Sequence, residues 1–391
     1  MDKVKVGIIG IGNMGSAHAL NITTGNCPEL ELTAVADTSK ARREWAAKEL
    51  PDSVKIFDNA DAMLNSGLIE AVIIAVPHYY HPVYAMKAFK HKLHVMSEKP
   101  AGVYTKQVKE MNAAAKEAGV VFGLMFNQRT NHVYRKMKEL VDSGKYGQIR
   151  RVNWLITNWY RPQAYYDSGS WRATWSGEGG GVLLNQCPHN LDLWQWICGM
   201  PVKISAHMAF GKWHDIEVED DVTIYAEYAN GATGTFITST GDLPGDNRFE
   251  ITMDGATLIV ENDKLKVIEL EKSIDEFSAT NTDVFGRPKA TTIFPETDGL
   301  NQQHIGVLNA FASAILHGTP LVARGEEGIN GLTISNAAHL SAWLGKEIDL
   351  PFDDDLYYEE LMKRVATSRR KPEFESKVAD TRGTYGVAEK K

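Results

Sequence analysis

The stretch Val4-Lys5-Val6-Gly7-Ile8-Ile9-Gly10-Ile11-Gly12-Asn13-Met14-Gly15 decides the fold of the first part of this chain. An apolar strand pattern runs directly into a G-x-G-x-x-G turn, and a helical pattern follows over 16–22. Asp37 ends the next strand pattern, at the interval of about 20 residues that is typical of dinucleotide-binding units. The glycines let the backbone approach a pyrophosphate closely, and N–H groups at the helix N-terminus stabilise it. The sequence therefore predicts a dinucleotide site.

Short apolar runs alternate with helical patterns through the first third of the chain. The strand patterns cover 4–9, 32–36, 71–76, 93–96 and 120–126. This alternation is typical of a parallel sheet with crossover helices. We predict an α/β Rossmann domain with a parallel sheet over 1–126.

Strand patterns follow one another directly in the second part of the chain. They cover 151–157, 202–210, 222–228, 233–239, 248–253, 257–261 and 265–270. Asn230-Gly231 and Asp254-Gly255 stand between pairs of them as hairpin turns. Two helical patterns follow, over 302–317 and 326–344. We predict a C-terminal α+β domain with a large, mostly antiparallel sheet over 127–368, with its last helices packed near the first domain. The charged stretch 369–391 is predicted to be an arm or tail.

The choice of dinucleotide depends on Asp37. A carboxylate at this position accepts hydrogen bonds from ribose hydroxyls and repels a 2′-phosphate, so NAD is favoured over NADP. Lys40, Arg42 and Arg43 lie nearby in the sequence and partly offset that repulsion. We expect NAD as the cofactor.

Two loops follow later strands of the predicted parallel sheet, over 76–82 and 97–100. Loops at the carboxyl ends of parallel strands face the ligand crevice, so both are expected beside the nicotinamide. The predicted cofactor-contacting residues are Gly10, Gly12, Asn13, Met14, Asp37, Val76, Pro77, His81, Glu98 and Lys99.

Two motifs carry a resemblance to a known family. They are Glu98-Lys99-Pro100 and the stretch over 179–192, which reads GGGVLLNQCPHNLD. Together with the glycine turn they resemble the glucose-fructose oxidoreductase and inositol dehydrogenase family, Gfo/Idh/MocA, over about residues 4–351. The resemblance implies that Lys99 orients a reacting hydroxyl and that His189 takes its proton. It also implies a homodimer or homotetramer paired through the large sheet.

The chemistry of alcohol oxidation needs these residue types. Loss of hydride from a secondary alcohol to nicotinamide leaves a hydroxyl proton for a base that titrates near neutrality, which histidine supplies. An ammonium stabilises the charge that develops on the oxygen. Many family members have Asp four residues before the histidine, where this chain has Asn185. Asn185 can bind a hydroxyl but cannot be a base, and Asp192 is either structural or orients His189.

An aromatic and arginine-rich loop over 158–175 suits the faces and hydroxyls of a pyranose ring. The alternative is a loop that covers a sheet or forms a subunit interface. Arg129 either binds substrate or ties the two domains together, and His214 has no assigned role. The predicted substrate-contacting residues are Lys99, Asn127, Arg129, Tyr160, Trp171, Arg172, Asn185 and His189.

Composition limits the partners and the compartment. The formal net charge is −8, with 42 Lys and Arg against 50 Asp and Glu, which argues against nucleic acid. No apolar stretch approaches the ~20 residues that span a bilayer, and the 3 cysteines suggest reduced thiols, so a cytoplasmic protein is expected. His78-x-x-His81 and His91-x-x-His94 lack the carboxylate partner of a zinc pattern, so no catalytic metal is expected.

These observations favour an NAD-dependent dehydrogenase that acts on a secondary hydroxyl of a sugar, a glycoside or an inositol-like polyol. Two other functions stay open on the sequence. One is a redox-neutral glycoside cleavage that retains NAD, and the other is a non-catalytic regulator that senses a nucleotide.

Overall fold

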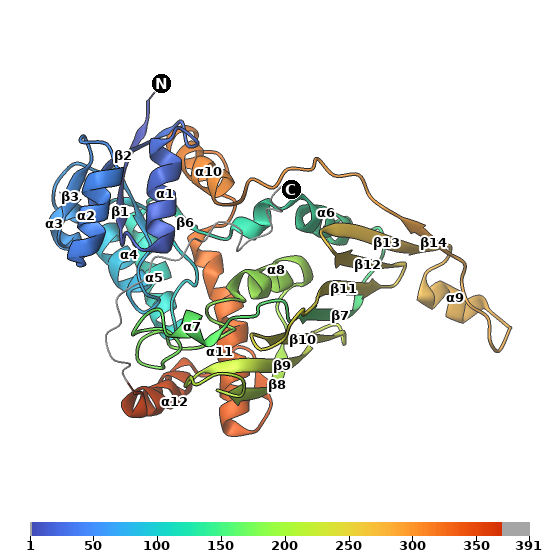
Figure 1. The fold of residues 1–391 in the computed structure, drawn as a ribbon. Helices are drawn as coiled ribbons and strands as arrows, with labels where there is room; N and C mark the ends of the chain where they lie inside the picture. Colours follow the sequence, from blue (N-terminus) through green and yellow to red (C-terminus); the bar gives the residue numbers. More distant parts are fainter. Residues whose placement is uncertain (1, 370–391) are drawn as a thin grey trace.

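The structure is a computed structural model that describes residues 2–369 of the 391-residue chain. Its first sheet has six parallel strands in the order β3-β2-β1-β4-β5-β6 (Figure 1). The strands are β1 (Val4–Ile9), β2 (Leu30–Ala36), β3 (Lys55–Phe57), β4 (Ala71–Ile74), β5 (His94–Ser97) and β6 (Phe122–Leu124). The helices between them are α1 (Asn13–Thr23), α2 (Lys40–Glu49), α3 (Ala60–Leu64), α4 (Tyr80–Lys90) and α5 (Thr105–Ala118).

The central strands of this sheet are buried on both faces. All four residues of β4 are buried, and so are five of the six in β1. This double burial explains the continuous apolar runs in the sequence, because helices cover both faces of a parallel sheet. The strand order reverses between β1 and β4, the point at which such sheets bind their ligand.

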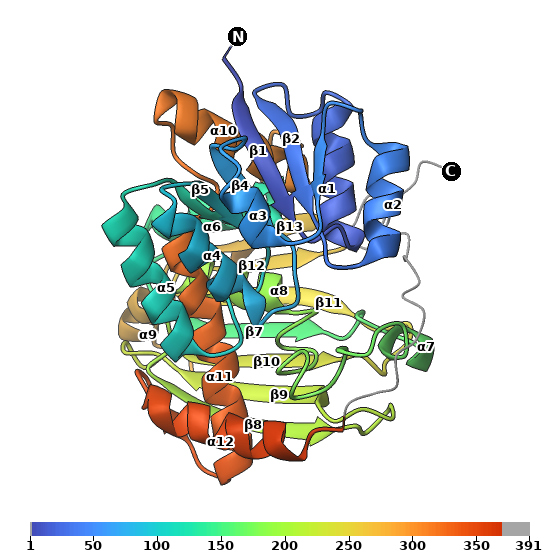
Figure 2. The same cartoon turned by 90° about the vertical axis from the view of Figure 1, so that its left-hand side faces the viewer.

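The second sheet has nine strands in the order β14-β13-β12-β11-β7-β10-β9-β8-β15 (Figure 2). They are β7 (Ile149–Ile156), β8 (Lys203–Phe210), β9 (Glu219–Glu227), β10 (Thr233–Ser239), β11 (Asn247–Met253), β12 (Ala256–Glu261), β13 (Lys264–Leu270), β14 (Ala290–Ile293) and β15 (Ile348–Asp349). Among the described strands of this second sheet, only the β7 and β10 pair is parallel. The predicted fold class, a Rossmann sheet followed by a mostly antiparallel sheet, is confirmed.

Aromatic packing joins this sheet to the helix that covers it. Trp154 of β7 stacks on Phe249 of β11 with ring centroids 4.1 Å apart. Trp194 of α8 (Pro188–Cys198) stacks on Phe236 of β10 at 5.4 Å. Along their strands, Trp154, Phe236 and Phe249 alternate with less buried neighbours, as expected for a sheet that buries one face.

The remaining helices all follow β6 in the chain. They are η1 (Asn127–Thr130), α6 (His132–Asp142), α7 (Gln163–Tyr166), α9 (Ile274–Thr280), α10 (Gln303–His317), η2 (Gly325–Glu327), α11 (Gly328–Leu344) and α12 (Asp354–Thr367). Val307 and Phe311 of α10 pack into the core of the first sheet, and α11 contacts both α5 and β8. The later helices therefore fix the position of one sheet relative to the other.

Several strand boundaries differ from the sequence patterns. The strand predicted over 71–76 ends at Ile74, because the chain leaves the sheet in the loop before α4. The pattern over 120–126 contributes only Phe122–Leu124. The short strands β3, β14 and β15 were not predicted, nor was α12. Apart from Arg369, the predicted tail lies outside the described residues. No helix within residues 2–369 is long and apolar enough to cross a membrane.

Candidate active site

Two glycines of the turn after β1, Gly10 and Gly15, leave no room for a larger residue. Gly10 has a φ of +89°, and a Cβ there would lie 2.4 Å from the carbonyl oxygen of Ala75. A Cβ on Gly15 would lie 1.8 Å from the carbonyl oxygen of Gly10. Helix α1 begins at Asn13, so its first N–H groups have no partner within the helix. These features fit the pyrophosphate of a dinucleotide.

Asp37 closes this turn from the end of β2. Its Oδ2 accepts a hydrogen bond from the Ile11 N–H at 2.7 Å, and its Oδ1 accepts one from the Ser39 N–H at 2.8 Å. The Arg42 side chain donates to the Ile11 carbonyl. Burial lowers the pKa of Arg42, and the Asp37 charge opposes that effect. The carboxylate thus lies beside the turn, where a ribose is expected.

Glu98 is a buried carboxylate that is hydrogen-bonded to His18 rather than facing an open site. Its Oε1 lies 2.7 Å from His18 Nε2, on α1. Burial alone would raise the pKa of Glu98, but the hydrogen bond from His18 and nearby positive charge lower it to about 2. Glu98 therefore carries its charge at neutral pH and fixes the loop before Lys99 against α1.

His81 ties together the two loops predicted beside the nicotinamide. Its Nδ1 lies 2.7 Å from the Pro100 carbonyl oxygen, and its Nε2 lies 2.7 Å from the Val76 carbonyl oxygen. Both ring nitrogens are thus occupied by backbone. The contacts favour a positioning role for His81, and direct contact with the cofactor stays a prediction.

Lys99 reaches from the first domain to the second. Its Nζ donates to the backbone carbonyl of Asn185 at 2.9 Å, across 86 residues of sequence. Burial lowers its pKa, the Glu98 and Glu178 carboxylates oppose this, and the Arg172 and Arg161 cations add to it. Lys99 therefore connects the loop after β5, in the first domain, to the segment before α8, in the second domain.

His189 lies in the first turn of α8 and is 1% exposed. Its ring packs edge-on against Phe126, with centroids 6.1 Å apart. Burial, and then the positive charge of Lys99, hold the pKa of His189 well below its usual value. A low pKa keeps the imidazole neutral at neutral pH, which is the form a general base needs.

The three glycines before His189 fold around a buried carboxylate of β9. Glu219 accepts hydrogen bonds from the Gly181 N–H at 2.8 Å and the Leu183 N–H at 3.0 Å. Its Oε2 also lies 2.9 Å from His339 Nε2, on α11. A Cβ at Gly181 would lie 2.0 Å from the Glu219 carbonyl oxygen. Glycine there lets the chain pass close to β9 and directs it into α8.

Arg129 and Asp192 form a buried pair that joins η1 to α8. The Arg129 Nε and Nη2 donate to the two oxygens of Asp192 at 2.8 and 2.7 Å. Arg129 also pairs with Glu327. Asn127 donates to the Gln303 side chain at 2.5 Å. These contacts bury the Arg129 side chain among residues of the second domain, and the roles of Arg129 and Asp192 stay predictions.

The aromatic loop lies over Lys99 and Asn185. The Arg172 guanidinium lies 4.6 Å from the ring centroids of both Tyr165 and Trp171, and its Nη1 donates to the Tyr165 hydroxyl at 2.9 Å. Trp171 packs edge-on against His78 at 5.8 Å. Trp171 and Arg172 are thus in contact with each other. Tyr160, at 41% exposure, is the most exposed of the predicted substrate residues.

Comparison with known protein families identifies two matching domains in this chain. Residues 4–126 match a model described as an oxidoreductase family with an NAD-binding Rossmann fold, and residues 134–259 match the GFO/IDH/MocA C-terminal domain. The chain belongs to the Gfo/Idh/MocA family. The predicted family is confirmed.

Relatives match from 58% to 90% of the chain. A scyllo-inositol 2-dehydrogenase (NADP(+)) of Bacillus subtilis is 25% identical over 356 residues, covering 86% of this chain and 93% of the relative. The D-glucoside 3-dehydrogenase of Escherichia coli is 28% identical over 246 residues, covering 58% and 68%. The WlbA dehydrogenase of Bordetella pertussis, solved with NADH and UDP-GlcNAcA, has a TM-score of 0.75 at 25% identity, covering 90% and 100%. Levoglucosan dehydrogenase, solved with NADH and levoglucosan, shares the fold at a TM-score of 0.74 and 21% identity, covering 90% and 100%.

Two residues of this Gfo/Idh/MocA site were not singled out from the sequence. Tyr165 lies at the centre of the loop contacts, 3.4 Å from Asn185 Oδ1 through its hydroxyl. Glu178 is 2% exposed and accepts a hydrogen bond from the Asn185 side chain. A glutamate directly before three glycines is the one sequence signal that could have drawn attention to Glu178.

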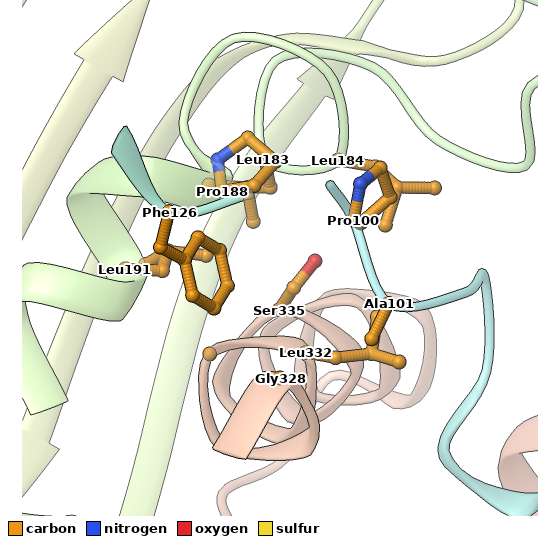
Figure 3. A pocket seen from close by; sticks show the side chains of 11 residues that line it. Pro100, Ala101, Phe126, Leu183, Leu184, Pro188, Leu191, Gly328, Leu332 and Ser335 are labelled. Carbon is orange, nitrogen blue, oxygen red and sulfur yellow. The ribbon is translucent and has the colours of Figure 1, made fainter. Parts of the chain in front are cut away.

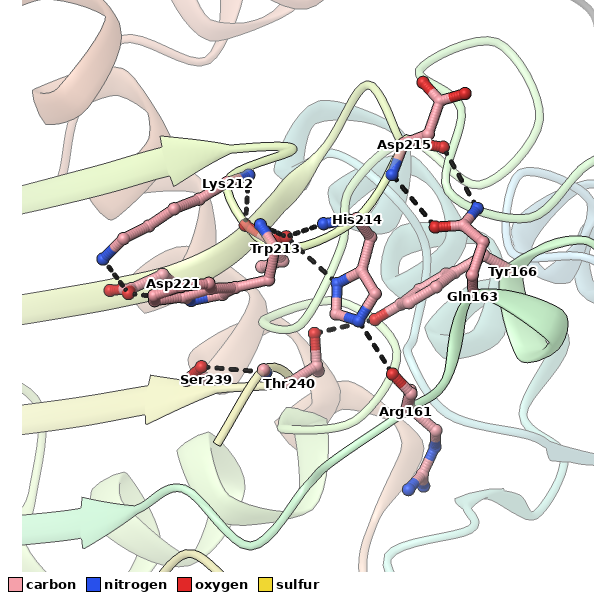
Figure 4. A network of polar contacts seen from close by, with 12 residues as sticks. Arg161, Gln163, Tyr166, Lys212, Trp213, His214, Asp215, Asp221, Ser239 and Thr240 are labelled. Atoms are coloured by element: carbon pink, nitrogen blue, oxygen red, sulfur yellow. Dashed lines mark hydrogen bonds and ion pairs between the residues drawn. The ribbon is translucent and has the colours of Figure 1, made fainter. Parts of the chain in front are cut away.

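His214 holds the outer end of the aromatic loop. Its Nδ1 lies 3.1 Å from the Asp220 carboxylate, and its Nε2 lies 2.8 Å from the Arg161 carbonyl oxygen (Figure 4). Tyr166 packs on its ring with centroids 4.8 Å apart. Asp220 also accepts the backbone N–H groups of 212–214. His214 therefore anchors the loop to β9.

An apolar pocket lies where the two domains join. Pro100 and Pro188, the chain neighbours of Lys99 and His189, both line it (Figure 3). The other lining residues are Ala101, Phe126, Leu183, Leu184, Leu191, Gly328, Gly331, Leu332 and Ser335. This lining has no charged group and suits a packed joint rather than hydroxyl recognition.

Among residues 2–369, no three side chains of the types that bind metal converge.

Proposed function

We propose that this protein is an NAD-dependent dehydrogenase that oxidises a secondary hydroxyl of a sugar, a glycoside or a cyclic polyol. The observation that carries the proposal is that Lys99 and His189 come together around one loop: Lys99 Nζ donates at 2.9 Å to the backbone carbonyl of Asn185, four residues before His189. One comes from a loop of the Rossmann domain and the other from the first turn of α8, and the Lys99 charge lowers the pKa of His189. An ammonium and a neutral imidazole in mutual range are the two groups that alcohol oxidation requires.

In this proposal the Lys99 ammonium donates to the substrate oxygen and stabilises the negative charge that develops there. His189 accepts the hydroxyl proton, which leaves a ketone once the carbon-bound hydride has departed. The nicotinamide, when bound, supplies the hydride acceptor. The residues suited to hold that cofactor are those of the glycine turn and Asp37. The protein therefore contributes orientation, charge and a base.

The relatives support a carbohydrate substrate. These relatives include an inositol dehydrogenase and a D-glucoside dehydrogenase, and solved neighbours hold a nucleotide sugar and levoglucosan. The loop with Tyr165, Trp171 and Arg172 offers ring faces and several hydrogen-bond donors, which suit a pyranose. Oxidation at C3 of a glucoside or an anhydrosugar is the specific case we favour.

The three cysteines are unpaired, which fits a cytoplasmic enzyme.

The test is a screen of sugars, glycosides and inositols with NAD and with NADP, following the absorbance of reduced cofactor. Wild type is compared with Lys99→Ala and His189→Ala, in which we expect kcat to fall by about 100-fold or more. For a glucoside substrate, deuterium at C3 should slow turnover. Release of an aglycone without net NADH would instead indicate redox-neutral cleavage, and nucleotide binding without any turnover would indicate a regulator.

A further inference from the structure

Glu178 is a buried carboxylate to which the proposed reaction gives no role. Its Oε2 accepts a hydrogen bond from the Ala173 N–H at 2.6 Å, and its Oε1 accepts one from Asn185 Nδ2. Its backbone also hydrogen-bonds the ring of His78. A carboxylate is costly to remove from water unless it is paired, and buried acids with specific partners concentrate at functional sites.

The Glu178 carboxylate fixes the direction of the Asn185 side-chain amide. An ionised carboxylate only accepts hydrogen bonds, so it must face the NH₂ group of Asn185. The amide oxygen then points the other way, where the Tyr165 hydroxyl lies 3.4 Å from it. The backbone carbonyl of the same Asn185 accepts from Lys99 Nζ at 2.9 Å. Asn185 therefore links Glu178 to Lys99.

The Glu178 charge also acts on Lys99 through space. Burial lowers the pKa of Lys99, and the carboxylates of Glu98 and Glu178 raise it. Glu98 is already paired with His18 at 2.7 Å. Burial likewise raises the pKa of Glu178, while Arg172 and the two N–H donors lower it. The Glu178 charge thus favours the charged form of Lys99.

Other titratable groups surround the same ammonium, from every element packed on it. They are His78, His81, Glu98, Arg161, Arg172, Cys187, His189 and His304. Most of these groups are cations or neutral rings, so removal of a single negative charge matters there.

We infer that Glu178 is a positioning residue of the dehydrogenase site, which orients the Asn185 amide and supplies a negative charge that keeps Lys99 protonated. The inference rests on the proposed function, because it gives Glu178 a role through Lys99. It also explains how the site works with Asn185, which holds no charge itself.

The experiment measures the titration of Lys99 without any substrate. Protein is acetylated briefly with acetic anhydride over a range of pH, and mass spectrometry follows modification of Lys99. We expect Glu178→Gln to move this titration to lower pH by about one unit, the effect of losing a nearby opposite charge. Glu178→Asp, which keeps the charge, should stay close to wild type. Glu269→Gln, whose acid pairs with Lys145 on the second sheet, is the matched control.

Steady-state kinetics give the second measurement. In Glu178→Gln we expect kcat to fall about tenfold and the KM for NAD to stay unchanged. The alkaline limb of the pH profile of kcat should move to lower pH, because Lys99 loses its proton at lower pH. Asn185→Ala removes the amide but keeps the backbone carbonyl that accepts from Lys99, so we expect a lower kcat and an unchanged Lys99 titration. If Glu178→Gln does not fold, this variant tests the positioning role instead. An unchanged Lys99 titration and an unchanged kcat in Glu178→Gln overturn the inference. If wild type oxidises no carbohydrate, the proposed function fails, but the Lys99 titration still tests the charge role of Glu178.

Discussion

Lys99 lowers the pKa of His189, after the larger effect of burial. A lowered pKa means that the neutral imidazole persists as pH falls, and activity is lost only below that pKa. In Lys99→Met one cause of the lowering is removed, so the acid limb of residual kcat should move to higher pH. We would measure kcat between about pH 5 and pH 8, the range in which histidine titrates.

The control for this pH profile is Lys87→Met, on the same domain. Lys87 pairs with Asp61 at the surface of α4, at 2.8 Å. Its removal should leave the acid limb where wild type has it. An acid limb that stays in place in Lys99→Met would mean that the charge of Lys99 does not reach His189.

Asp37 is the residue that we expect to select NAD. In Asp37→Asn the amide oxygen can still accept from one of the two N–H groups of the turn, at Ile11 or Ser39. The charge that repels a 2′-phosphate is lost, and Arg42 and Arg43 remain. We expect the ratio of kcat/KM for NADP over NAD to rise about 10- to 100-fold. Asp58→Asn, at an exposed position after β3, is the control, and an unchanged ratio in Asp37→Asn would contradict the prediction.

Single residues differ in how far the sequence reveals them. Gly10 and Asp37 were predicted because the glycine turn is contiguous in the sequence and the acid follows at a typical interval, at the end of the next strand. The meeting of Lys99 with Asn185 spans 86 residues, so only the family resemblance pointed to it. Glu178 was missed because a glutamate in a polar loop is normally solvated, and its burial depends on how that loop packs on Ala173 and Asn185.

At the scale of elements, the strands with strong patterns were predicted and the shortest were not. β1 and β10 have the predicted bounds, since each follows a clear apolar or alternating run. β3 has 3 residues and β15 has 2, too few for any period to show. Their pairing partners, rather than their own sequence, bring them into the sheets.

The glycine loop that leads into α8 gives the prediction at this scale. In Gly181→Ala the new Cβ would lie 2.0 Å from the Glu219 carbonyl oxygen, so the loop or β9 must move. We expect a loss of about 1 to 3 kcal/mol in the free energy of unfolding, as overpacking typically costs, and a loss of turnover because His189 is displaced. Urea denaturation and kcat measure both effects. Gly255→Ala, whose Cβ would make an ordinary contact at 3.5 Å with Tyr146, should change neither.

At the scale of the whole molecule, the second sheet has an outer face that carries apolar side chains. Tyr225 of β9 and Ile237 of β10 are 41% and 37% exposed, on neighbouring strands. Their chain neighbours Ile224 and Phe236 are buried on the opposite face, which α8 covers. Figure 1 also places α9 and β14 at the end of this sheet far from the Rossmann domain, where Phe285 is 88% exposed. Apolar groups gathered on a sheet face favour pairing with a second chain.

We therefore predict a homodimer or homotetramer formed through this face, to be measured by light scattering. Replacing both Tyr225 and Ile237 with lysine should lower the mass toward that of one chain, because like charges would meet across a symmetric interface. Leu68→Lys, at an exposed position before β4 of the first sheet, should leave the mass unchanged. Since the site residues Lys99, Asn185 and His189 all come from one chain, the dissociated variant should keep its turnover if it stays folded. A wild type with the mass of a single chain would contradict the predicted assembly without touching the proposed chemistry.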